Sequence, residues 1–347
     1  MDIQAYLGLS QKVTCSFHSR ALHFLKPAKT SRNTLVQHDV AYIMLHGPNG
    51  LGIGEFAPIR GLSKDTIEML PALVEDWNKS DQKWNWPIWQ MRSSAFAFAL
   101  ETALLHHNGN FLKPFQPIPI NGLVWMNELE TMFDEALLKI NAGFDCIKLK
   151  VGAHRFEDEI ELLHRIRKHA PPHQITLRLD ANGAFSPSDA LDKLKALAAF
   201  DIHSIEQPIR AGQIEQMAEI CANSPIPIGL DEELIGIHSL EAKNVLLSSI
   251  RPHYVILKPT LHGGLQGSDE WIQVASLLGI GWWATSALES NVGLHAIAQW
   301  LQQISYQGHQ GLGTGSLYSN NIPAPMRVEN GMLLWDANQQ WQFDFLN

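Results

Sequence analysis

The chain has 347 residues, with 26 Lys and Arg against 35 Asp and Glu, so its formal net charge at pH 7 is −9. Hydrophobic residues make up 45% and charged residues 18%, which predicts a globular protein and excludes an intrinsically disordered chain. An acidic chain without a block of basic residues also argues against nucleic acid or an anionic membrane as the main partner. Three scattered cysteines, Cys15, Cys146 and Cys221, exclude a disulfide framework and fit a reducing compartment.

We expect neither a targeting segment nor a membrane span. The start of the chain, MDIQAYLGLSQKV, lacks the charged and then apolar pattern of a signal peptide. Residues 271–288 carry no charge, but they include Gly, Ser, Thr and Gln, so we expect a helix end, a turn and a buried strand there. The sequence therefore predicts a cytoplasmic protein without membrane insertion.

The first part of the chain predicts an α+β unit over residues 1–110. Asn49-Gly50 is typical of a hairpin turn, and Gly109 is typical of the end of a helix. The expected strands lie at residues 12–24, 34–46 and 51–56. The expected helices lie at residues 64–77 and 92–107.

From residue 118 onward, short apolar strands alternate with amphipathic helices, and each of the first seven strands is followed by a helix. The eight expected strands lie at residues 118–121, 146–151, 175–180, 203–206, 226–231, 254–258, 281–286 and 310–313. This repeat predicts a (β/α)8-type barrel over residues 111–318, with a doubly wound sheet as the alternative. The tail at 319–347 fits neither period, and we expect it to return to the N-terminal unit and complete a capping domain.

Five charged residues fall at or just beyond the ends of successive strands, at intervals of 25 to 30 residues: Lys150, Asp180, Glu206, Asp231 and Lys258. The carboxyl ends of barrel strands meet at one mouth, where the active sites of such barrels lie. The spacing therefore predicts that these five side chains face one another.

Three of the five are carboxylates on adjacent strands, and unpaired carboxylates that face one another repel. A cation resolves the repulsion, and a ligand set of oxygens without His or Cys favours Mg²⁺. The alternative for each acid is to cap the following helix or to pair with a surface lysine. Taken together, Asp180, Glu206 and Asp231 predict a magnesium site.

Lys148 and Lys150 lie two residues apart on a strand, so both point to the same face. Their apolar neighbours take the other face, against the helices, so we expect both lysines to point into the barrel. The alternative is an ordinary surface strand. Inside the barrel, Lys148 and a nearby cation favour a neutral Lys150 amine that can accept a proton. Lys258 enters from the opposite side of the mouth, an arrangement that suits proton abstraction next to a carboxylate.

The chain resembles the enolase superfamily, in its muconate-lactonizing subgroup, in five segments that come in order: Lys148-x-Lys150, Asp180-x-Asn182, Glu206-x-Pro208, Asp231-Glu232 and Lys258-Pro259-Thr260. Within this subgroup it is most similar to the o-succinylbenzoate synthases in three segments: NGLVW (121–125), RLDANGAF (178–185) and TSALESNVGLHA (285–296). Residues 52–61, GIGEFAPIRG, resemble a capping-domain loop.

The resemblance implies roles for the charged residues at the mouth. Lys150 removes the α-proton of the substrate, Lys258 stabilises the resulting enediolate by its charge, and Lys148 tunes Lys150. Asp180, Glu206 and Asp231 bind Mg²⁺, for which Mn²⁺ can substitute.

Five further residues are candidates for contact with the substrate. The resemblance places Ser286, Glu289 and Ser290 in a segment that touches polar groups of the substrate. Arg178 lies two residues before Asp180 and is expected to orient neighbouring groups, or else to form a core salt bridge. Gly311, in Gly311-x-Gly-x-Gly315 after the eighth strand, suits close backbone approach to a carboxylate or a plain tight turn.

The implied reaction is the loss of water from 2-succinyl-6-hydroxy-2,4-cyclohexadiene-1-carboxylate, which gives o-succinylbenzoate in menaquinone biosynthesis. The expected partner is thus a small carboxylate substrate. An N-succinylamino-acid racemase or a cycloisomerase of the same superfamily is the first alternative, and a metal-binding barrel without catalysis is the second. The chain lacks the Asp-x-Asp of dipeptide epimerases after strand eight, which argues against that activity. The sequence predicts no oligomeric state.

Overall fold

The N-terminal part of the molecule is an antiparallel sheet with the strand order β1-β2-β3, whose three strands lie where the sequence predicts strands. The strands are β1 (Thr14–Lys29), β2 (Thr34–Gly47) and β3 (Gly50–Phe56). Gly50 sits at the predicted hairpin turn with a φ of 101°, a conformation that glycine adopts without strain. This computed structural model describes residues 12–29, 34–82, 85–109 and 112–346. Most of residues 1–13, for which the sequence predicts no signal peptide, therefore lies outside the described residues.

Helices follow the sheet: η1 (Ile67–Met69), α2 (Leu70–Lys79), α3 (Trp86–Arg92) and α4 (Ser94–His107). The N-terminus of α4 is capped by Ser93, whose hydroxyl accepts a hydrogen bond from the Phe96 N–H at 3.0 Å. Gly54 lets β3 approach this helix closely, since a Cβ there would lie 1.9 Å from the Ala99 carbonyl oxygen. Helix α3 is not predicted from the sequence, because its seven residues are too few for a helical period to stand out.

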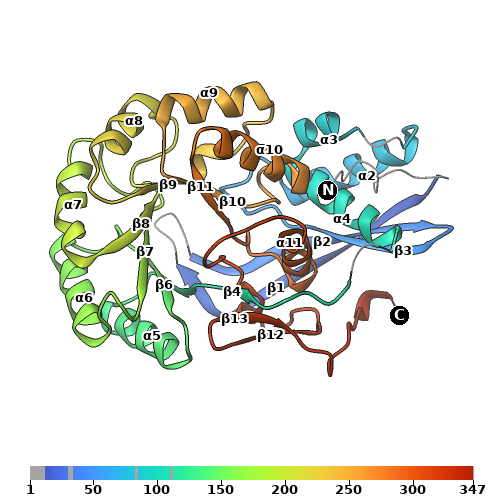
Figure 1. Cartoon of the computed structure of the whole chain (residues 1–347). Coiled ribbons are helices and arrows are strands. Elements are labelled where there is room, and N and C mark those ends of the chain that lie inside the picture. The colour runs from blue at the N-terminus through green and yellow to red at the C-terminus, as the bar shows by residue number, and fades with distance from the viewer. Residues whose placement is uncertain (1–11, 30–33, 83–84, 110–111, 347) are drawn as a thin grey trace.

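The rest of the chain confirms the barrel-type α/β fold, with a seven-stranded parallel sheet in the order β11-β10-β9-β8-β7-β6-β5. Its strands are β5 (Gly122–Val124), β6 (Cys146–Lys150), β7 (Thr176–Asp180), β8 (Ile202–Glu206), β9 (Ile228–Leu230), β10 (Tyr254–Leu257) and β11 (Gly281–Ala284). The helices that follow them are α5 (Leu129–Asn141), α6 (Phe156–His169), α7 (Ala190–Leu197), α8 (Ile214–Asn223), α9 (Leu240–Ile250), α10 (Gly264–Leu277) and α11 (Asn291–Leu301). Helices α5 to α9 form an arc outside the parallel strands (Figure 1).

The edge of the barrel differs in part from the prediction at 118–121, where only Ile120 pairs in parallel, as an isolated bridge to Gln310, and the full expected strand does not form. Instead, β4 (Ile118–Pro119) pairs antiparallel with β13 (Met332–Trp335), so the first parallel strand is β5. The cause is a partner more than 200 residues away in the sequence, which no local pattern reveals. Isolated parallel bridges at Ile120–Gln310 and Thr285–Gly311 place the predicted eighth strand between the two edges of the sheet.

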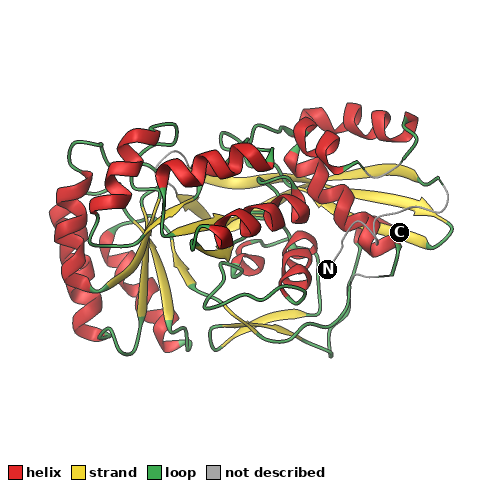
Figure 2. Cartoon of the chain, turned by 45° about the horizontal axis from the view of Figure 1, so that its top comes forward, coloured by secondary structure: helices red, strands yellow, loops and turns green. Residues whose placement is uncertain are grey.

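The tail reaches the N-terminal sheet as well as the barrel. Its strand β12 (Met326–Glu329) pairs with β13. Asp344 accepts hydrogen bonds from the Arg20 guanidinium of β1 at 2.7 and 2.9 Å. Phe345 stacks on Tyr42 of β2, with ring centroids 4.6 Å apart. These contacts fix the antiparallel sheet beside the barrel, and Figure 2 shows the two sheets side by side.

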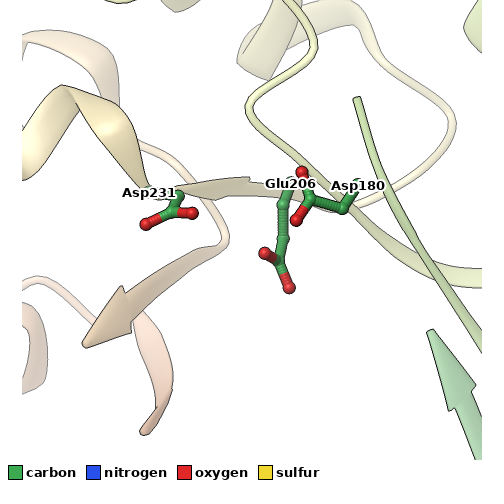
Figure 3. Close-up of side chains that lie close together, drawn as sticks. All are labelled: Asp180, Glu206 and Asp231. Carbon is green, nitrogen blue, oxygen red and sulfur yellow. The ribbon is translucent and has the colours of Figure 1, made fainter. Parts of the chain in front are cut away.

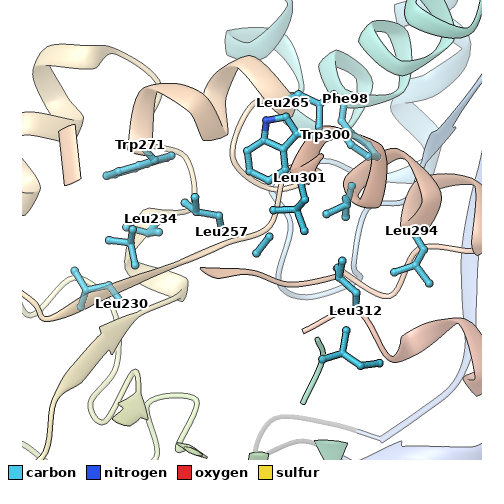
Figure 4. Packing of buried hydrophobic residues seen from close by; sticks show 14 of the residues in the cluster. Phe98, Leu230, Leu234, Leu257, Leu265, Trp271, Leu294, Trp300, Leu301 and Leu312 are labelled. Carbon is cyan, nitrogen blue, oxygen red and sulfur yellow. The ribbon is translucent and has the colours of Figure 1, made fainter. Parts of the chain in front are cut away.

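One continuous hydrophobic core joins the two parts. Phe98 of α4, Leu265 of α10, and Trp300 and Leu301 of α11 are all buried in the same cluster, part of which Figure 4 shows. Helix α4 therefore joins the N-terminal unit to the barrel through a shared hydrophobic core.

The uncharged stretch at 271–288 folds as expected. It contains the end of α10, a turn at Gly279 and strand β11. Among the described residues, no helix is long and apolar enough to cross a membrane.

Candidate active site

Parallel pairing brings the predicted charged residues to one end of the barrel. Asp180 and Glu206 are the last residues of β7 and β8 and lie opposite each other in the register, while Lys150 ends β6 opposite Asp180. Asp231 and Lys258 directly follow β9 and β10. Figure 3 shows the three carboxylate side chains close together. One carboxylate oxygen from each lies within 4.8 Å of the other two, and all three residues are fully buried.

The three carboxylates fit a divalent cation. Glu206 Oε1 and Asp231 Oδ1 are buried, and neither has a hydrogen-bond partner within the described part of the chain. A buried carboxylate oxygen without a partner is costly. Because the group offers only hard oxygen ligands, a small ion such as Mg²⁺ or Mn²⁺ suits it better than a soft metal. The acidic group is therefore a candidate metal site.

Three lysines surround the carboxylates. The Lys148 ammonium forms ion pairs with Glu206 and, at 2.9 Å, with Asp180. Lys150 donates to Asp180 Oδ2 at 2.6 Å, and Lys258 pairs with Asp231 on the other flank. Lys148 and Lys150 both point into the barrel, since each side chain is about nine-tenths buried. The structure thus brings all six predicted catalytic and metal-ligating residues together.

The charges in this cluster shift one another's protonation. Burial lowers the pKa of Lys148, but the charges of Asp180, Glu206 and Asp231 outweigh burial and leave that pKa raised. Burial raises the pKa of Asp180, and the two neighbouring lysines more than reverse this effect, so it stays ionised. The pKa of Glu206 rises to about 7, first because of burial and then because Asp180 and Asp231 repel its charge. The pKa of Lys258 is raised in spite of burial, chiefly by Asp231.

A cavity of about 750 Å³ opens over this cluster. Lys150, Asp180 and Lys258 lie on its wall, together with two of the predicted substrate-binding residues, Ser286 and Gly311. The N-terminal unit contributes apolar residues to the lining, among them Phe24, Leu35, Ile59 and Leu62. The lining therefore combines charged groups of the barrel, which suit a carboxylate, with apolar residues of the N-terminal unit.

The other three predicted substrate-binding residues, Arg178, Glu289 and Ser290, are buried and do not line the cavity. Glu289 is fully buried, and its carboxylate accepts hydrogen bonds from Thr260, Ser286 and the Ala287 N–H. Ser290 is also fully buried and caps α11, where its hydroxyl accepts from the Val292 N–H.

Arg178 belongs to the barrel interior, one layer below Asp180. Its guanidinium lies over the ring of Trp283, 4.0 Å from the centroid, and donates to the His309 carbonyl oxygen at 2.8 Å. It forms a cation–π contact in place of the core salt bridge considered as its alternative.

Asn182, for which the sequence predicts no role, also lies in the site. Its side-chain oxygen accepts from Lys150 at 2.8 Å, and its amide donates to Glu232 at 2.9 Å. A local signal for Asn182 exists, since it sits two residues after the Asp180 ligand in the same motif. The apolar residues of the N-terminal unit carry no such signal, because their place over the barrel depends on packing between distant segments.

Residues 131–343 match the family described as Enolase C-terminal domain-like. The chain is 40% identical to the o-succinylbenzoate synthase of Desulfotalea psychrophila (strain LSv54 / DSM 12343), over 92% of this chain and 98% of that protein. The crystal structure of MenC from Desulfotalea psychrophila LSv54 superimposes with a TM-score of 0.80 at 37% identity, over 93% of this chain and all of that one.

A likeness in fold alone extends to the muconate lactonizing enzyme of Pseudomonas fluorescens complexed with muconolactone. Its TM-score is 0.82 at 20% identity, over 96% of this chain and 98% of that one. With the family match and the 40% identity, these findings show that the chain belongs to the enolase superfamily and, within it, to the o-succinylbenzoate synthases.

Proposed function

We propose that this chain is a Mg²⁺-dependent dehydratase that converts 2-succinyl-6-hydroxy-2,4-cyclohexadiene-1-carboxylate into o-succinylbenzoate in menaquinone biosynthesis. The observation that carries the proposal is the pair of lysines, Lys150 and Lys258, on opposite flanks of three convergent carboxylates. Both lysines also lie on the wall of the cavity. A base on one side and a fixed positive charge on the other are what proton abstraction next to a carboxylate requires.

Lys150 acts as base and then as acid in this proposal. Its neutral Nζ takes the proton from the ring carbon that bears the carboxylate, and the resulting ammonium gives a proton to the departing hydroxyl on the same face. Water leaves, a ring double bond forms, and the ring becomes aromatic. Asn182 orients the Lys150 amine through its side-chain oxygen.

Lys258 contributes its charge from the other side, and Lys148 adds positive charge beside Lys150. Asp180, Glu206 and Asp231 would hold Mg²⁺, with Mn²⁺ as a substitute. When bound, the ion supplies positive charge next to the substrate carboxylate and offsets the repulsion among the three acids. Ser286 and Gly311 contact polar groups of the substrate from the cavity wall.

Two further features belong to the proposal. Residues 1–110 and 319–347 form a capping domain over a barrel domain at 111–318, supported by the contacts of Arg20 and Tyr42 with the tail. The protein works in the cytoplasm, supported by three buried cysteines that are all free.

The N-succinylamino-acid racemase activity is the second candidate. Racemisation needs proton transfer on both faces of a carbon, and Lys150 and Lys258 flank the acids from two sides. The expected test is an assay of purified protein with Mg²⁺ and the cyclohexadiene substrate by ultraviolet absorbance, beside a chiral assay on N-succinyl amino acids. Aromatisation without racemisation supports the dehydratase, whereas no aromatisation would overturn it.

A further inference from the structure

The carboxylate of Glu289 joins two loops that carry parts of the site. Its Oε2 accepts from the Ser286 hydroxyl at 2.6 Å and from the Ala287 N–H at 2.7 Å, both in the loop after β11. Its Oε1 accepts from the Thr260 hydroxyl at 2.5 Å, in the loop after β10. Glu289 and Thr260 are both fully buried, so neither bond competes with bulk water.

Thr260 belongs to the turn that starts at Lys258. The Lys258 carbonyl oxygen accepts from the Leu261 N–H at 2.8 Å and from the His262 N–H at 3.0 Å, and the Lys258 N–H donates to the His262 ring at 3.0 Å. Thr260 is thus enclosed in a turn that fixes the backbone of the lysine. Its bond to Glu289 attaches that turn to the Ser286 loop.

Glu55 extends the same system into the N-terminal unit. This residue of β3 is fully buried. Its carboxylate accepts from the Ser290 N–H at 2.7 Å, the Ser290 hydroxyl at 2.6 Å and the Gly293 N–H at 2.7 Å. Ser290 directly follows Glu289, so adjacent residues bind the N-terminal unit on one side and the Lys258 turn on the other.

We infer that Glu289, Thr260 and Glu55 are positioning residues for Lys258 and Ser286. This inference rests on the proposed function for its kinetic consequence, since it assigns to Lys258 the charge that stabilises the transition state. The brace made by these three residues holds Lys258 at a fixed distance from the reacting carbon. Through Glu55, it also makes the position of the Lys258 turn depend on the position of the N-terminal unit.

The test compares Thr260→Val, which removes the hydroxyl at nearly constant shape, with Thr260→Ser, which keeps it. Asp65→Asn is the matched control, because Asp65 is a buried carboxylate that accepts from the Ala95 N–H at 2.9 Å within the N-terminal unit alone. Hydrogen–deuterium exchange of the peptides at 258–264 and 286–290, read by mass spectrometry, measures the brace without any assay of activity.

We expect faster exchange at 258–264 in Thr260→Val than in the wild type and in Thr260→Ser, with no change there in Asp65→Asn. Dehydration by Thr260→Val should show a kcat about 10- to 100-fold lower with KM little changed, and Thr260→Ser should recover most of it. Equal exchange in all four proteins would overturn the brace, even if the wild type is active. Absence of wild-type turnover with the expected exchange pattern would instead overturn the proposed function and leave the brace supported.

A second variant covers the case in which Thr260→Val fails to fold. Glu55→Gln replaces one carboxylate oxygen with an NH2 group, so the side chain can no longer accept all three hydrogen bonds from Ser290 and Gly293. We expect faster exchange at 286–293 and, through Glu289, at 258–264. Faster exchange at 286–293 without any at 258–264 would contradict transmission from the N-terminal unit to Lys258.

Discussion

Two groups of buried carboxylates in this molecule differ in what faces them. At the barrel mouth, Asp180, Glu206 and Asp231 face lysine ammonium groups, and two of their oxygens have no partner among the described residues. Between the N-terminal unit and the barrel, both oxygens of Glu55 and of Glu101 accept hydrogen bonds. Burial alone therefore does not make a cation site. A candidate cation site needs several carboxylates that lie close together and keep oxygens without hydrogen-bond partners, as in the described residues at the barrel mouth.

The second group holds two helices by their N-termini. Glu101 of α4 accepts from the N–H groups of Leu265 and Gln266 in the first turn of α10, at 2.6 and 3.1 Å. Glu55 does the same for α11. The first N–H groups of a helix lack partners within it, and a negative charge there is favourable. These carboxylates dock one unit on the other, whereas those at the mouth leave capacity for a ligand.

Metal removal should have the largest effect on activity. It should act only through the three carboxylates at the barrel mouth and not through Glu55 and Glu101. Treatment with EDTA is expected to abolish dehydration, because the three acids at the mouth need a cation, and Mg²⁺ or Mn²⁺ should restore it. The ultraviolet assay measures both steps. Full turnover by metal-free protein would contradict the claim that dehydration requires a cation at these carboxylates.

Substitutions of Lys150 and Lys258 distinguish the roles of the two lysines at the barrel mouth. We expect Lys150→Ala to lower kcat by about 10³-fold or more, on the scale of losing a general base together with its acid role. Lys258→Arg should retain more dehydration activity than Lys258→Ala, because it keeps the charge. Steady-state kinetics of the three variants test this order. Comparable losses in Lys150→Ala and Lys258→Ala, with proton exchange from both faces of the substrate, would favour the racemase.

Glu55 and Glu101, which bind the N-termini of α11 and α10, should affect the stability of the fold rather than the reaction. Glu101→Gln replaces one of the two carboxylate oxygens with an NH2 group. One of the buried N–H groups of Leu265 and Gln266 then faces a second donor and loses its acceptor. We expect a loss of about 1 to 3 kcal/mol in the free energy of unfolding, measured with urea, and retention of Mg²⁺-dependent turnover in the folded variant. A loss of metal binding in Glu101→Gln would erase the distinction between the two groups.

The smallest expected effect is a pH dependence from Glu55. Burial raises the pKa of this carboxyl from 4.5 to about 7 in the folded chain. Between these pH values the folded chain holds a proton that the unfolded chain has released, so stability falls as pH rises through this window. Relative to Glu55→Gln, the wild type should lose up to about 1 kcal/mol per pH unit between pH 5 and 6.5. Parallel stability curves for the two proteins would contradict this.

The mouth could be predicted from sequence because its residues obey the repeat of the barrel. Each β/α unit returns the chain to the same end, so residues 25 to 30 positions apart converge without any knowledge of packing. Asp180 and Glu206 illustrate this, since each is the last residue of its strand.

The rest of the site depends on distant partners. Glu289 and Ser290 sit in a segment that resembles a substrate-binding one, yet the capping of α11 and a carboxylate 235 residues earlier, Glu55, turn Ser290 away from the cavity. In the same way, the predicted strand at 118–121 is divided, because β13 pairs with Ile118 and Pro119 while Ile120 bridges Gln310. Local sequence records neither interaction.

The most direct test of the central claim is calorimetric titration of Mg²⁺ into metal-free wild type, Glu206→Gln and Glu101→Gln. We expect the wild type and Glu101→Gln to bind Mg²⁺ with similar affinity, and Glu206→Gln to lose most of this affinity because a neutral amide replaces a charged ligand. Undiminished Mg²⁺ binding by folded Glu206→Gln would contradict the claim that the carboxylates at the barrel mouth form the metal site.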